Sequence, residues 1–442
     1  MKKLILFFFS ITIILSAQQR EKIVLDLNRA IDLALDKNSE IKVAQMEVNK
    51  SKEKLREALS GLYPKLDLSA QYQRYIKKPV IFLPPGTPFS PGNKPGILEI
   101  GSDNSYNGSA SLSVPLFAWS LYESIGVASN SLDLSTESYR NTKVQIIGNV
   151  KKSFLAVLLS REMKNLMELS LKNAEDNFEN IKRLNKAGTL SDYDVLRAEV
   201  QVENLKPTVL QMENNYKLSL EALKVAIGLD ASEDIEVVGE LDFEEPYQLP
   251  SEDEIISELL KTNPQLSILE QQVKLYEKMV SLEKSSYLPT LAGFGSYQYQ
   301  TQANDFNFSE YRWVKTFIVG FQIQLPVFNG FKTQSRVSQA EISLSQAKEQ
   351  KRNLTEAIKT QALSILYRIQ QALKRIEGQS KTVKQAEEGY NIARRRLENG
   401  LATQLEVNDA ELALRQARIN RLQAIYDLKV AEAELNTVLG KN

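Results

Sequence analysis

The side chains of this chain that could do chemistry are mainly carboxylates and lysines, because its 442 residues include no cysteine and no histidine. The missing histidine excludes a Ser-His-Asp triad, a histidine general base and an imidazole-bound zinc site. The missing cysteine excludes disulfides, thiol nucleophiles and thiolate metal sites. Carboxylate pairs remain, but the acids fall on the polar faces of helical segments at no shared spacing. We therefore predict no catalytic, cofactor-binding or metal-binding residues, and no enzyme activity.

The charge balance limits the partners. Lysine plus arginine equals aspartate plus glutamate, at 55 each, so the formal net charge is zero. A neutral chain has no strong field that would draw it to a phosphate backbone, and we expect no nucleic-acid partner.

The first residues resemble a secretory signal. Lys2 and Lys3 precede an apolar run from Leu4 to Leu15, and small residues follow up to Ala17. No other run approaches the roughly 20 apolar residues of a membrane helix. We expect residues 1–17 to be removed and the mature protein to be exported, entering a membrane only through β-strands. Without cysteine, we expect no N-terminal lipid anchor.

A short turn occurs twice and predicts two helical hairpins. Each copy has a glycine, then a hydroxyl residue three positions later, then an acid three positions after that. Glycine commonly follows a helix end, and the hydroxyl and acid can form a capping box at the next helix start. The residues are Gly188, Ser191 and Asp194 in the first copy, and Gly400, Thr403 and Glu406 in the second.

The elements around the turns also repeat. Each half has a helix, two strands with apolar and polar alternation, a long proline-free helix, the glycine turn and a last helix. The last helices carry apolar residues at 3,4 spacing, which is typical of coiled coils. At about 1.5 Å per residue, each proline-free helix would be about 100 Å long. The strands are predicted at about 64–76, 105–116, 289–301 and 313–326, with strand–helix junctions at Pro64, Pro115, Pro289 and Pro326.

These patterns divide the mature chain into two repeats, residues 18–228 and 252–442, joined by a linker at 229–251. The linker has eight acidic residues between Asp230 and Glu245 and no basic one, which favours a solvated surface segment. A short strand is predicted near Ile235. The proline-rich segment from Pro79 to Pro95 is predicted to be loop.

Four strands of about ten residues match membrane-spanning barrel strands in length. Four strands cannot close a barrel, and an open edge is not tolerated in lipid. Several chains would therefore have to combine their strands. The competing interpretation is a soluble sheet attached to a helical bundle.

In this order, and duplicated, the motifs resemble the TolC family of outer membrane efflux channels over essentially the whole mature chain. The residues that carry the resemblance are the helix-to-strand pairs Tyr63-Pro64 and Leu288-Pro289, the strand-to-helix runs Pro115-Leu-Phe117 and Pro326-Val-Phe328-Asn-Gly330, and the paired glycine turns. The first half departs from the family at Phe117-Ala-Trp119, so the bend after that strand is expected to differ between halves.

The resemblance implies an α+β membrane protein with a long α-helical coiled-coil tunnel in the periplasm and a transmembrane β-barrel. It implies a homotrimer in outer-membrane lipid whose four strands per chain make one twelve-stranded barrel. It also implies a tripartite efflux or type I secretion system, in which a periplasmic adaptor joins the channel to a proton-driven or ATP-driven inner-membrane pump.

The resemblance places a periplasmic gate after the second glycine turn, at Glu406 and Asp409. Capping is an alternative role for Glu406, stabilising the helix start by about 0.5 to 2 kcal/mol. The corresponding first-half residues, Asp194 and Arg197, are not expected to supply an acid ring. The implied adaptor-docking tips, which could also be solvated turns, are Gly188, Thr189, Leu190, Gly400, Leu401 and Ala402.

Two other functions compete with a channel. One is a structural periplasmic coiled-coil protein that bridges envelope layers, and the other is a hydrolase with paired carboxylates, for which the sequence offers no site. The sequence does not identify the cargo as drug, metal or protein.

Overall fold

The computed structural model describes residues 22–89, 92–243 and 246–441. The expected signal peptide, residues 1–17, lies outside them. The chain divides into two compact units. The first unit contains the described parts of Met1–Gln45, Tyr139–Pro264 and Thr355–Asn442, and the second contains those of Met46–Ser138 and Gln265–Leu354.

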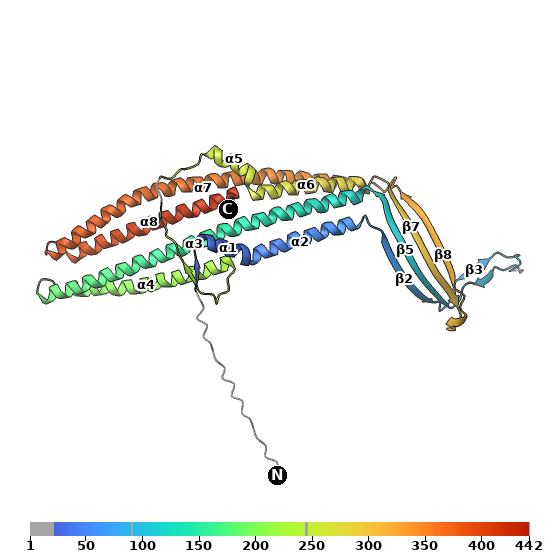
Figure 1. Cartoon of the computed structure of the whole chain (residues 1–442), viewed down its shortest axis with the longest axis horizontal. Coiled ribbons are helices and arrows are strands. Elements are labelled where there is room, and N and C mark those ends of the chain that lie inside the picture. Colours follow the sequence, from blue (N-terminus) through green and yellow to red (C-terminus); the bar gives the residue numbers. More distant parts are fainter. Residues whose placement is uncertain (1–21, 90–91, 244–245, 442) are drawn as a thin grey trace, which may run out of the picture. The chain divides into compact units, whose positions relative to one another are not determined.

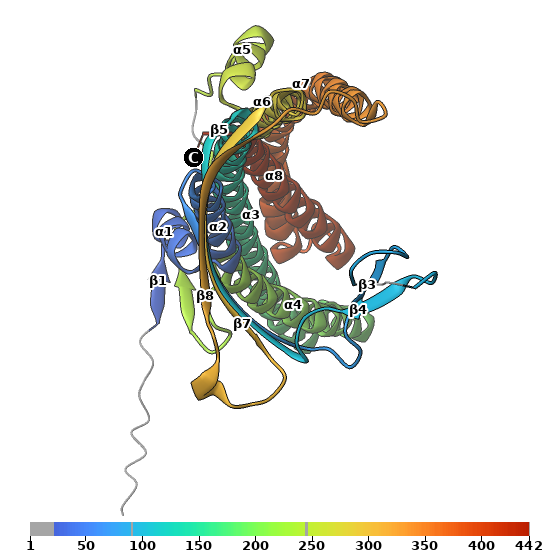
Figure 2. The same cartoon turned by 90° about the vertical axis from the view of Figure 1, so that its right-hand side faces the viewer.

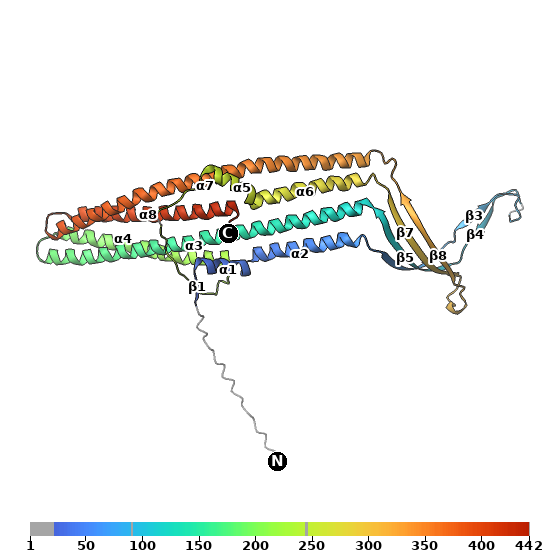
Figure 3. The ribbon, with the colours of Figure 1, turned by 45° about the horizontal axis from the view of Figure 1, so that its top comes forward.

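The first unit contains the larger part of two helical hairpins, whose longer helices begin in the second unit (Figure 1). Helix α3 (Trp119–Lys186) is followed by α4 (Asp192–Ile227), and α7 (Lys332–Glu398) by α8 (Gln404–Leu439). Figure 3 shows the two members of each pair side by side. The predicted hairpins are therefore confirmed. No helix in the described ranges has an apolar stretch that could cross a membrane.

The 3,4 pattern of α4 and α8 marks the buried side of each helix. On α4, the residues Ala198, Val202 and Leu205 are buried, and Val202 and Leu205 pack with Ala174 of α3. On α8, the buried seam runs through Val407, Leu414, Ala417, Ala424, Leu428, Ala431 and Leu435. Burial of these apolar surfaces supplies the main stabilisation of such long helices, because propensity alone is weak.

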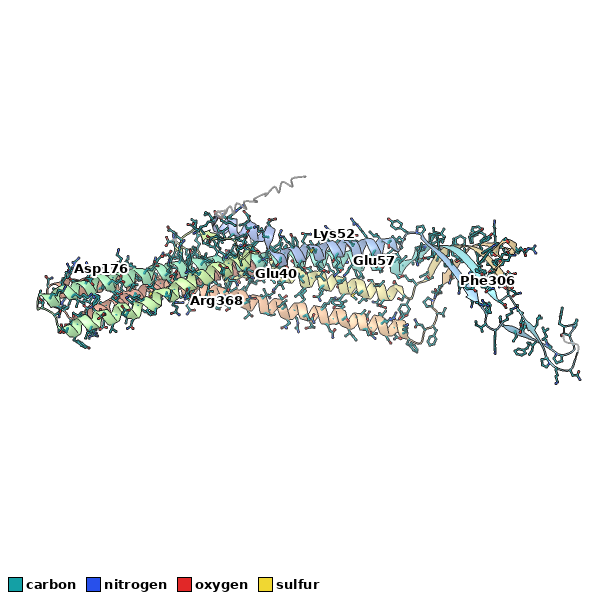
Figure 4. All side chains as sticks on the ribbon, turned by 90° about the horizontal axis from the view of Figure 1, so that it is seen from below. Glu40, Lys52, Glu57, Asp176, Phe306 and Arg368 are labelled. Carbon is teal, nitrogen blue, oxygen red and sulfur yellow. The ribbon has the colours of Figure 1, made fainter. Side chains whose placement is uncertain are left out.

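Ion pairs lie beside the seam of the α7–α8 hairpin. Arg368 of α7, labelled in Figure 4, pairs with Glu434 of α8. Further along, Arg375 Nη1 lies 2.6 Å from Asp427 Oδ2. These pairs are partly exposed, so each contributes about 0 to 1 kcal/mol and mainly fixes the register of the two helices.

Two short helices of the first unit, α1 (Leu27–Lys37) and α5 (Glu252–Thr262), contact α4 and α8 respectively. Each is followed in the chain by a longer helix that belongs mainly to the second unit, α2 (Ser39–Ser60) after α1 and α6 (Pro264–Ser285) after α5. The break between α1 and α2 lies at buried Asn38, whose Nδ2 donates to the Ala226 carbonyl at 3.0 Å. The break between α5 and α6 lies at buried Asn263, whose Nδ2 donates to the Val438 carbonyl at 2.7 Å. The same amide anchor thus occurs in both repeats.

The predicted strand near Ile235 is present as β6 (Ile235–Val237), which pairs in parallel with β1 (Ile23–Leu25). The sequence did not indicate β1. Its side chains alternate only over three residues, and its partner lies about two hundred residues away in the chain.

The second unit contains a four-stranded antiparallel sheet in the order β2-β5-β7-β8 (Figure 1). Figure 2 shows β7 and β8 of this sheet side by side. The strands are β2 (Lys65–Arg74), β5 (Asn104–Ala118), β7 (Thr290–Ala303) and β8 (Val314–Gln324). A 3₁₀ turn, η1 (Phe308–Glu310), lies between β7 and β8. Each repeat contributes two neighbouring strands, and β2 and β8 are the edges.

The proline-rich segment is not only loop, which corrects the sequence expectation. It contains a second, two-stranded sheet made of β3 (Val80–Leu83) and β4 (Gly96–Glu99). The prolines lie at its ends, where Pro79 precedes β3, Pro84 follows it and Pro95 precedes β4. A proline there removes no interior ladder hydrogen bond, so four-residue strands fit between the prolines.

Candidate functional site

The first helical tip is a tight turn closed by backbone hydrogen bonds. Helix α3 ends at Lys186, and Gly188 has a φ of 78°, a left-handed conformation that favours glycine. The Thr189 amide donates to the Leu184 carbonyl at 2.9 Å, as in a Schellman motif. Thr189 is exposed and Leu190 is half-buried.

The predicted capping box of the first tip is present. The Ser191 amide donates to Asp194 Oδ2 at 3.1 Å, and the Asp194 amide donates to Ser191 Oγ at 3.3 Å. Asp194 is thus committed to the start of α4. Arg197, one turn later, is half-buried.

The second tip repeats this construction. Gly400 has a φ of 69°, and the Leu401 amide donates to the Arg396 carbonyl at 2.8 Å. In its capping box, the Thr403 amide donates to Glu406 Oε1 at 3.2 Å, and the Glu406 amide donates to Thr403 Oγ1 at 3.3 Å. Leu401 is exposed and Ala402 is half-buried. The backbones of the two tips are alike, so any difference in their function must come from their side chains.

The two acids assigned to a gate have different surroundings. Glu406 serves the cap, and its Oε2 also lies 3.7 Å from Arg396 Nη1. Asp409 lies one turn further along α8 and is exposed. The capping role of Glu406 is therefore confirmed. Asp409 is placed where its charge faces solvent in the single chain.

A polar cleft separates the two hairpins near their tips. It has a volume of about 390 Å³ and lies between α3 and the α7–α8 hairpin. Asp176 of α3, labelled in Figure 4, is one of its lining residues. The remaining lining residues are Asn173, Asn177, Asn180 and Arg183 of α3, Tyr390, Arg394 and Glu398 of α7, and Val407 of α8. The sides of the hairpins that face each other across this cleft thus carry mainly amides and charges.

Beyond the cleft, two polar side chains of α8 are buried between the hairpins. Gln404 is 2% exposed, and its Nε2 donates to Asn408 Oδ1 at 2.7 Å. Its Oε1 is buried and accepts no hydrogen bond from the described residues. Glu411 is 9% exposed and lies 3.4 Å from Arg415 Nη1. Buried polar groups without full hydrogen bonding cost free energy, so this contact is weaker than an apolar one of the same size.

Burial also affects the titration of this region. It raises the pKa of the Glu411 carboxyl, and the nearby Arg415 guanidinium opposes that rise only in part. The pKa of the Tyr390 hydroxyl is raised by burial and by the negative charge of Glu411. The uncharged form of Glu411 is therefore favoured more than it would be in water.

Sequence reasoning missed Gln404 and Glu411 as members of the seam. They continue its spacing, since Gln404 lies three residues before Val407, and Glu411 lies three residues before Leu414. Polar residues at seam positions were the available signal. Polar residues at the seam positions of a coiled coil lower its stability, so they indicate a role other than stabilisation.

The sheet has two chemically different faces. The register places Leu68, Ala110, Tyr297 and Phe317 in one row across the four strands. The next row, on the opposite face, is Ser69, Ser109, Gln298 and Thr316. Leu68 and Phe317 are exposed, and so are most apolar side chains on their face. The alternation predicted from the sequence is thus confirmed, with one apolar face and one mainly polar face on which Phe294 and Ile318 are apolar exceptions.

The junction prolines occupy three kinds of position. Pro64 and Pro289 lie immediately before β2 and β7, and Pro326 lies two residues after β8. Pro115 lies within β5, where the register shifts between Pro115 and Phe117. Strand β5 therefore continues to Ala118, beyond the expected end, because the irregularity accommodates the proline.

The bends that follow β5 and β8 differ, as expected. Strand β5 leads directly into α3 at Trp119. After β8 a loop precedes α7, and Gly330 and Phe331 have φ values of 65° and 64°. In the part of the chain that the structure describes, no group of three or more acidic side chains is placed to hold a metal ion.

Comparison with known proteins gives consistent results. The family model described as outer membrane efflux protein matches residues 30–229 and 255–441. The cobalt-zinc-cadmium resistance protein CzcC of Cupriavidus metallidurans is 24% identical over 326 residues, which cover 72% of this chain and 73% of CzcC. The probable efflux pump outer membrane protein TtgC of Pseudomonas putida is 21% identical over 423 residues, which cover 94% of this chain and 82% of TtgC.

A solved structure shares the fold. The crystal structure of the Campylobacter jejuni CmeC outer membrane channel superposes with a TM-score of 0.77 at 17% sequence identity, covering 94% of this chain and 85% of CmeC. The family match extends through both repeats and includes both tips. This chain therefore belongs to the outer membrane efflux protein family.

Proposed function

We propose that this protein is the outer-membrane channel of a tripartite efflux or type I secretion system. It would conduct passively what an inner-membrane pump delivers through a periplasmic adaptor, and it would hydrolyse nothing. The observation that carries this function is the two-faced sheet with open edges in a member of the outer membrane efflux protein family. Such a sheet fits lipid on one side and water on the other.

A homotrimer would satisfy the open edges. Strands β2 and β8 each have one partner in the single chain, and unpaired backbone groups are too costly in lipid to remain open. Three copies would join β8 of one chain to β2 of the next and close twelve strands. The apolar rows would then face lipid, and the serine and glutamine rows would line a polar lumen.

The first unit also has a surface that suits assembly. Helix α4 exposes a stripe of large apolar side chains on the side away from its seam: Tyr193, Leu196, Val200, Leu210, Leu218 and Val225. Such a stripe on a charged coiled coil favours contact with another helix. In the proposed trimer, the covering helices come from a neighbouring copy, and the hairpins together make the periplasmic tunnel.

The gate is proposed at the tips. Asp409 would line the narrow end of the tunnel with its counterparts from the other copies, and Glu406 would contribute charge while capping α8. The polar contact between the hairpins, built around Gln404 and Glu411, supports this position because it is the less costly contact to separate. Opening would then be a local change at the ends of α7 and α8.

The exposed tips would dock the adaptor. Gly188 and Thr189 in the first hairpin, and Gly400 and Leu401 in the second, leave their turns free of packing in the single chain. The relative CzcC is described as a metal resistance protein and TtgC as an efflux pump component. The cargo of this chain would be set by its pump, and metal ions or small organic molecules are both compatible with its lumen.

Cell fractionation tests this function. We expect the protein in the outer-membrane fraction, resistant to a salt wash, migrating as a trimer in SDS before heating and as a monomer after heating. A structural periplasmic coiled coil would instead be released with the soluble periplasm. That result would overturn the channel function.

A further inference from the structure

The β3–β4 hairpin is not explained by conduction. It extends beyond the end of the four-stranded sheet, on the segment between β2 and β5 (Figures 1 and 3). Its two strands pair in antiparallel register, with Ile81 opposite Leu98 and Phe82 opposite Ile97.

Both faces of the hairpin are mainly apolar. Alternation places Val80, Phe82 and Ile97 on one face, with Glu99 opposite Val80 at the base, and Ile81, Leu83 and Leu98 on the other. Phe82 is 68% exposed on the first face, and Ile81 is 49% exposed on the second. An isolated two-stranded hairpin is at best marginally stable in water, and uncovered apolar strands promote aggregation. The hairpin therefore requires cover on two sides.

The base of the hairpin is held in place. Lys78 Nζ lies 3.0 Å from Asp103 Oδ1, and the Asp103 amide donates to Asn304 Oδ1 at 2.9 Å. Asn304 follows β7, so these contacts tie the hairpin base to the neighbouring loop. The hairpin leaves the sheet at β2, which is the edge strand that would meet another copy.

We propose that the β3–β4 hairpin packs against the same hairpin in the two other copies and covers the outer mouth of the channel. The packing rests on the trimer proposed above. Around a threefold axis each hairpin has two neighbours, so one apolar face meets the neighbour on one side and the opposite face meets the neighbour on the other. A head-to-tail contact of this kind closes into a ring, and it requires an apolar surface on both faces of each hairpin.

The dimensions permit this contact. Twelve strands about 4.8 Å apart and tilted by about 40° enclose a barrel with a radius of about 12 Å. Seven extended residues, such as those from Lys78 to Pro84, reach about 23 Å at about 3.3 Å each. The hairpin is thus long enough to reach the axis from the rim.

A lipid surface is a poorer occupant. A segment that lies on a membrane has one apolar and one polar face, because its outer side remains in water. This hairpin would leave either Phe82 or Ile81 and its neighbours in water on a membrane. Contact with two copies buries both faces.

Disulfide trapping tests the contact, and the absence of cysteine from the chain makes the readout specific. The variant carrying both Phe82→Cys and Leu98→Cys places thiols on opposite faces, so they cannot pair within one hairpin but would meet between copies. Mild oxidation should convert most of the purified trimer to covalent trimer on a reducing-agent-free, heated gel. Each single variant, and the control Ile76→Cys outside the strands, should form at least tenfold less covalent trimer.

Two outcomes separate the cap from the channel itself. Trimers that stay intact on an unheated gel but yield only monomers after oxidation and heating would overturn the cap and leave the channel function standing. Absence of the unheated trimer in the cysteine-free parent would overturn the proposed function. As a second measurement, Phe82→Ser with Ile97→Ser should increase uptake of a large glycopeptide antibiotic severalfold when compared within a variant whose tips are opened by Asp409→Ala and Glu406→Ala. Unchanged uptake in that comparison would contradict an occluded mouth.

Discussion

Replacing Gln404 by methionine should hold the tips closed. Gln404 lies almost fully buried between the hairpins, with Oε1 unpaired and Nε2 bonded to Asn408. An unsatisfied buried polar atom costs about 1 to 3 kcal/mol, and the hydrogen bond that would be lost contributes about 0.5 to 1.5 kcal/mol. Asn408 is half-buried and can turn to water instead. Methionine has similar volume and helix propensity.

The net effect is a closed contact that is more stable by about 1 kcal/mol in each copy. Three copies that open together would gain about 3 kcal/mol, and each 1.4 kcal/mol is about tenfold in an equilibrium. The open probability of Gln404→Met should therefore fall about a hundredfold.

Single-channel recording in planar bilayers measures this probability. Gln416→Met is the matched control, because Gln416 and Asn420 make the same i,i+4 bond at 2.9 Å on an exposed part of α8. We expect the control to behave as the parent protein. An open probability of Gln404→Met that equals or exceeds that of the control would refute the role of the buried amide.

Two further predictions concern stability, measured by thermal unfolding of the purified trimer. Glu411→Gln should raise the unfolding midpoint at pH 8 and lose most of this advantage at pH 4, whereas exposed Glu388→Gln should not. Burial raises the pKa of Glu411, so protonation of that carboxyl stabilises the folded state, and this stabilisation is lost as pH rises through the folded-state pKa. A difference in unfolding midpoint between Glu411→Gln and the parent that grew at low pH would contradict this sign. Gly188→Ala should cost about 1 to 2 kcal/mol from its positive φ alone, and Gly228→Ala should cost more, because its Cβ would lie 2.9 Å from Asn38 Cα. Equal losses would mean that the helix end relaxes around Asn38.

The parts of the fold that sequence reasoning identified depend on local rules. A glycine at a helix end, a hydroxyl at the next helix start and an acid three residues later produced both tips as expected. The 3,4 spacing identified the buried side of α4 and α8, and alternation identified the faces of the sheet. Duplication strengthened each of these signals, since every pattern occurred twice.

The parts that were missed depend on distant partners or on short segments. Strand β1 is defined by its pairing with β6, and neither strand has enough residues to show a period. Strands β3 and β4 are four residues each and lie between prolines, which usually indicate a loop. Two acids of α8 illustrate the same difference. The capping role of Glu406 is local and was predictable, whereas the burial of Glu411 depends on the opposite hairpin and was not.

Conductance of the purified trimer is the most direct test of a channel gated at its helical tips. The parent protein should insert into planar bilayers and produce small, uniform, cation-selective steps. Asp409→Ala together with Glu406→Ala should give larger steps with weaker cation preference, because the negative charges at the narrow end would be gone. A purified trimer that gives no steps, or a double variant whose conductance and selectivity equal those of the parent, would contradict this function for the tips.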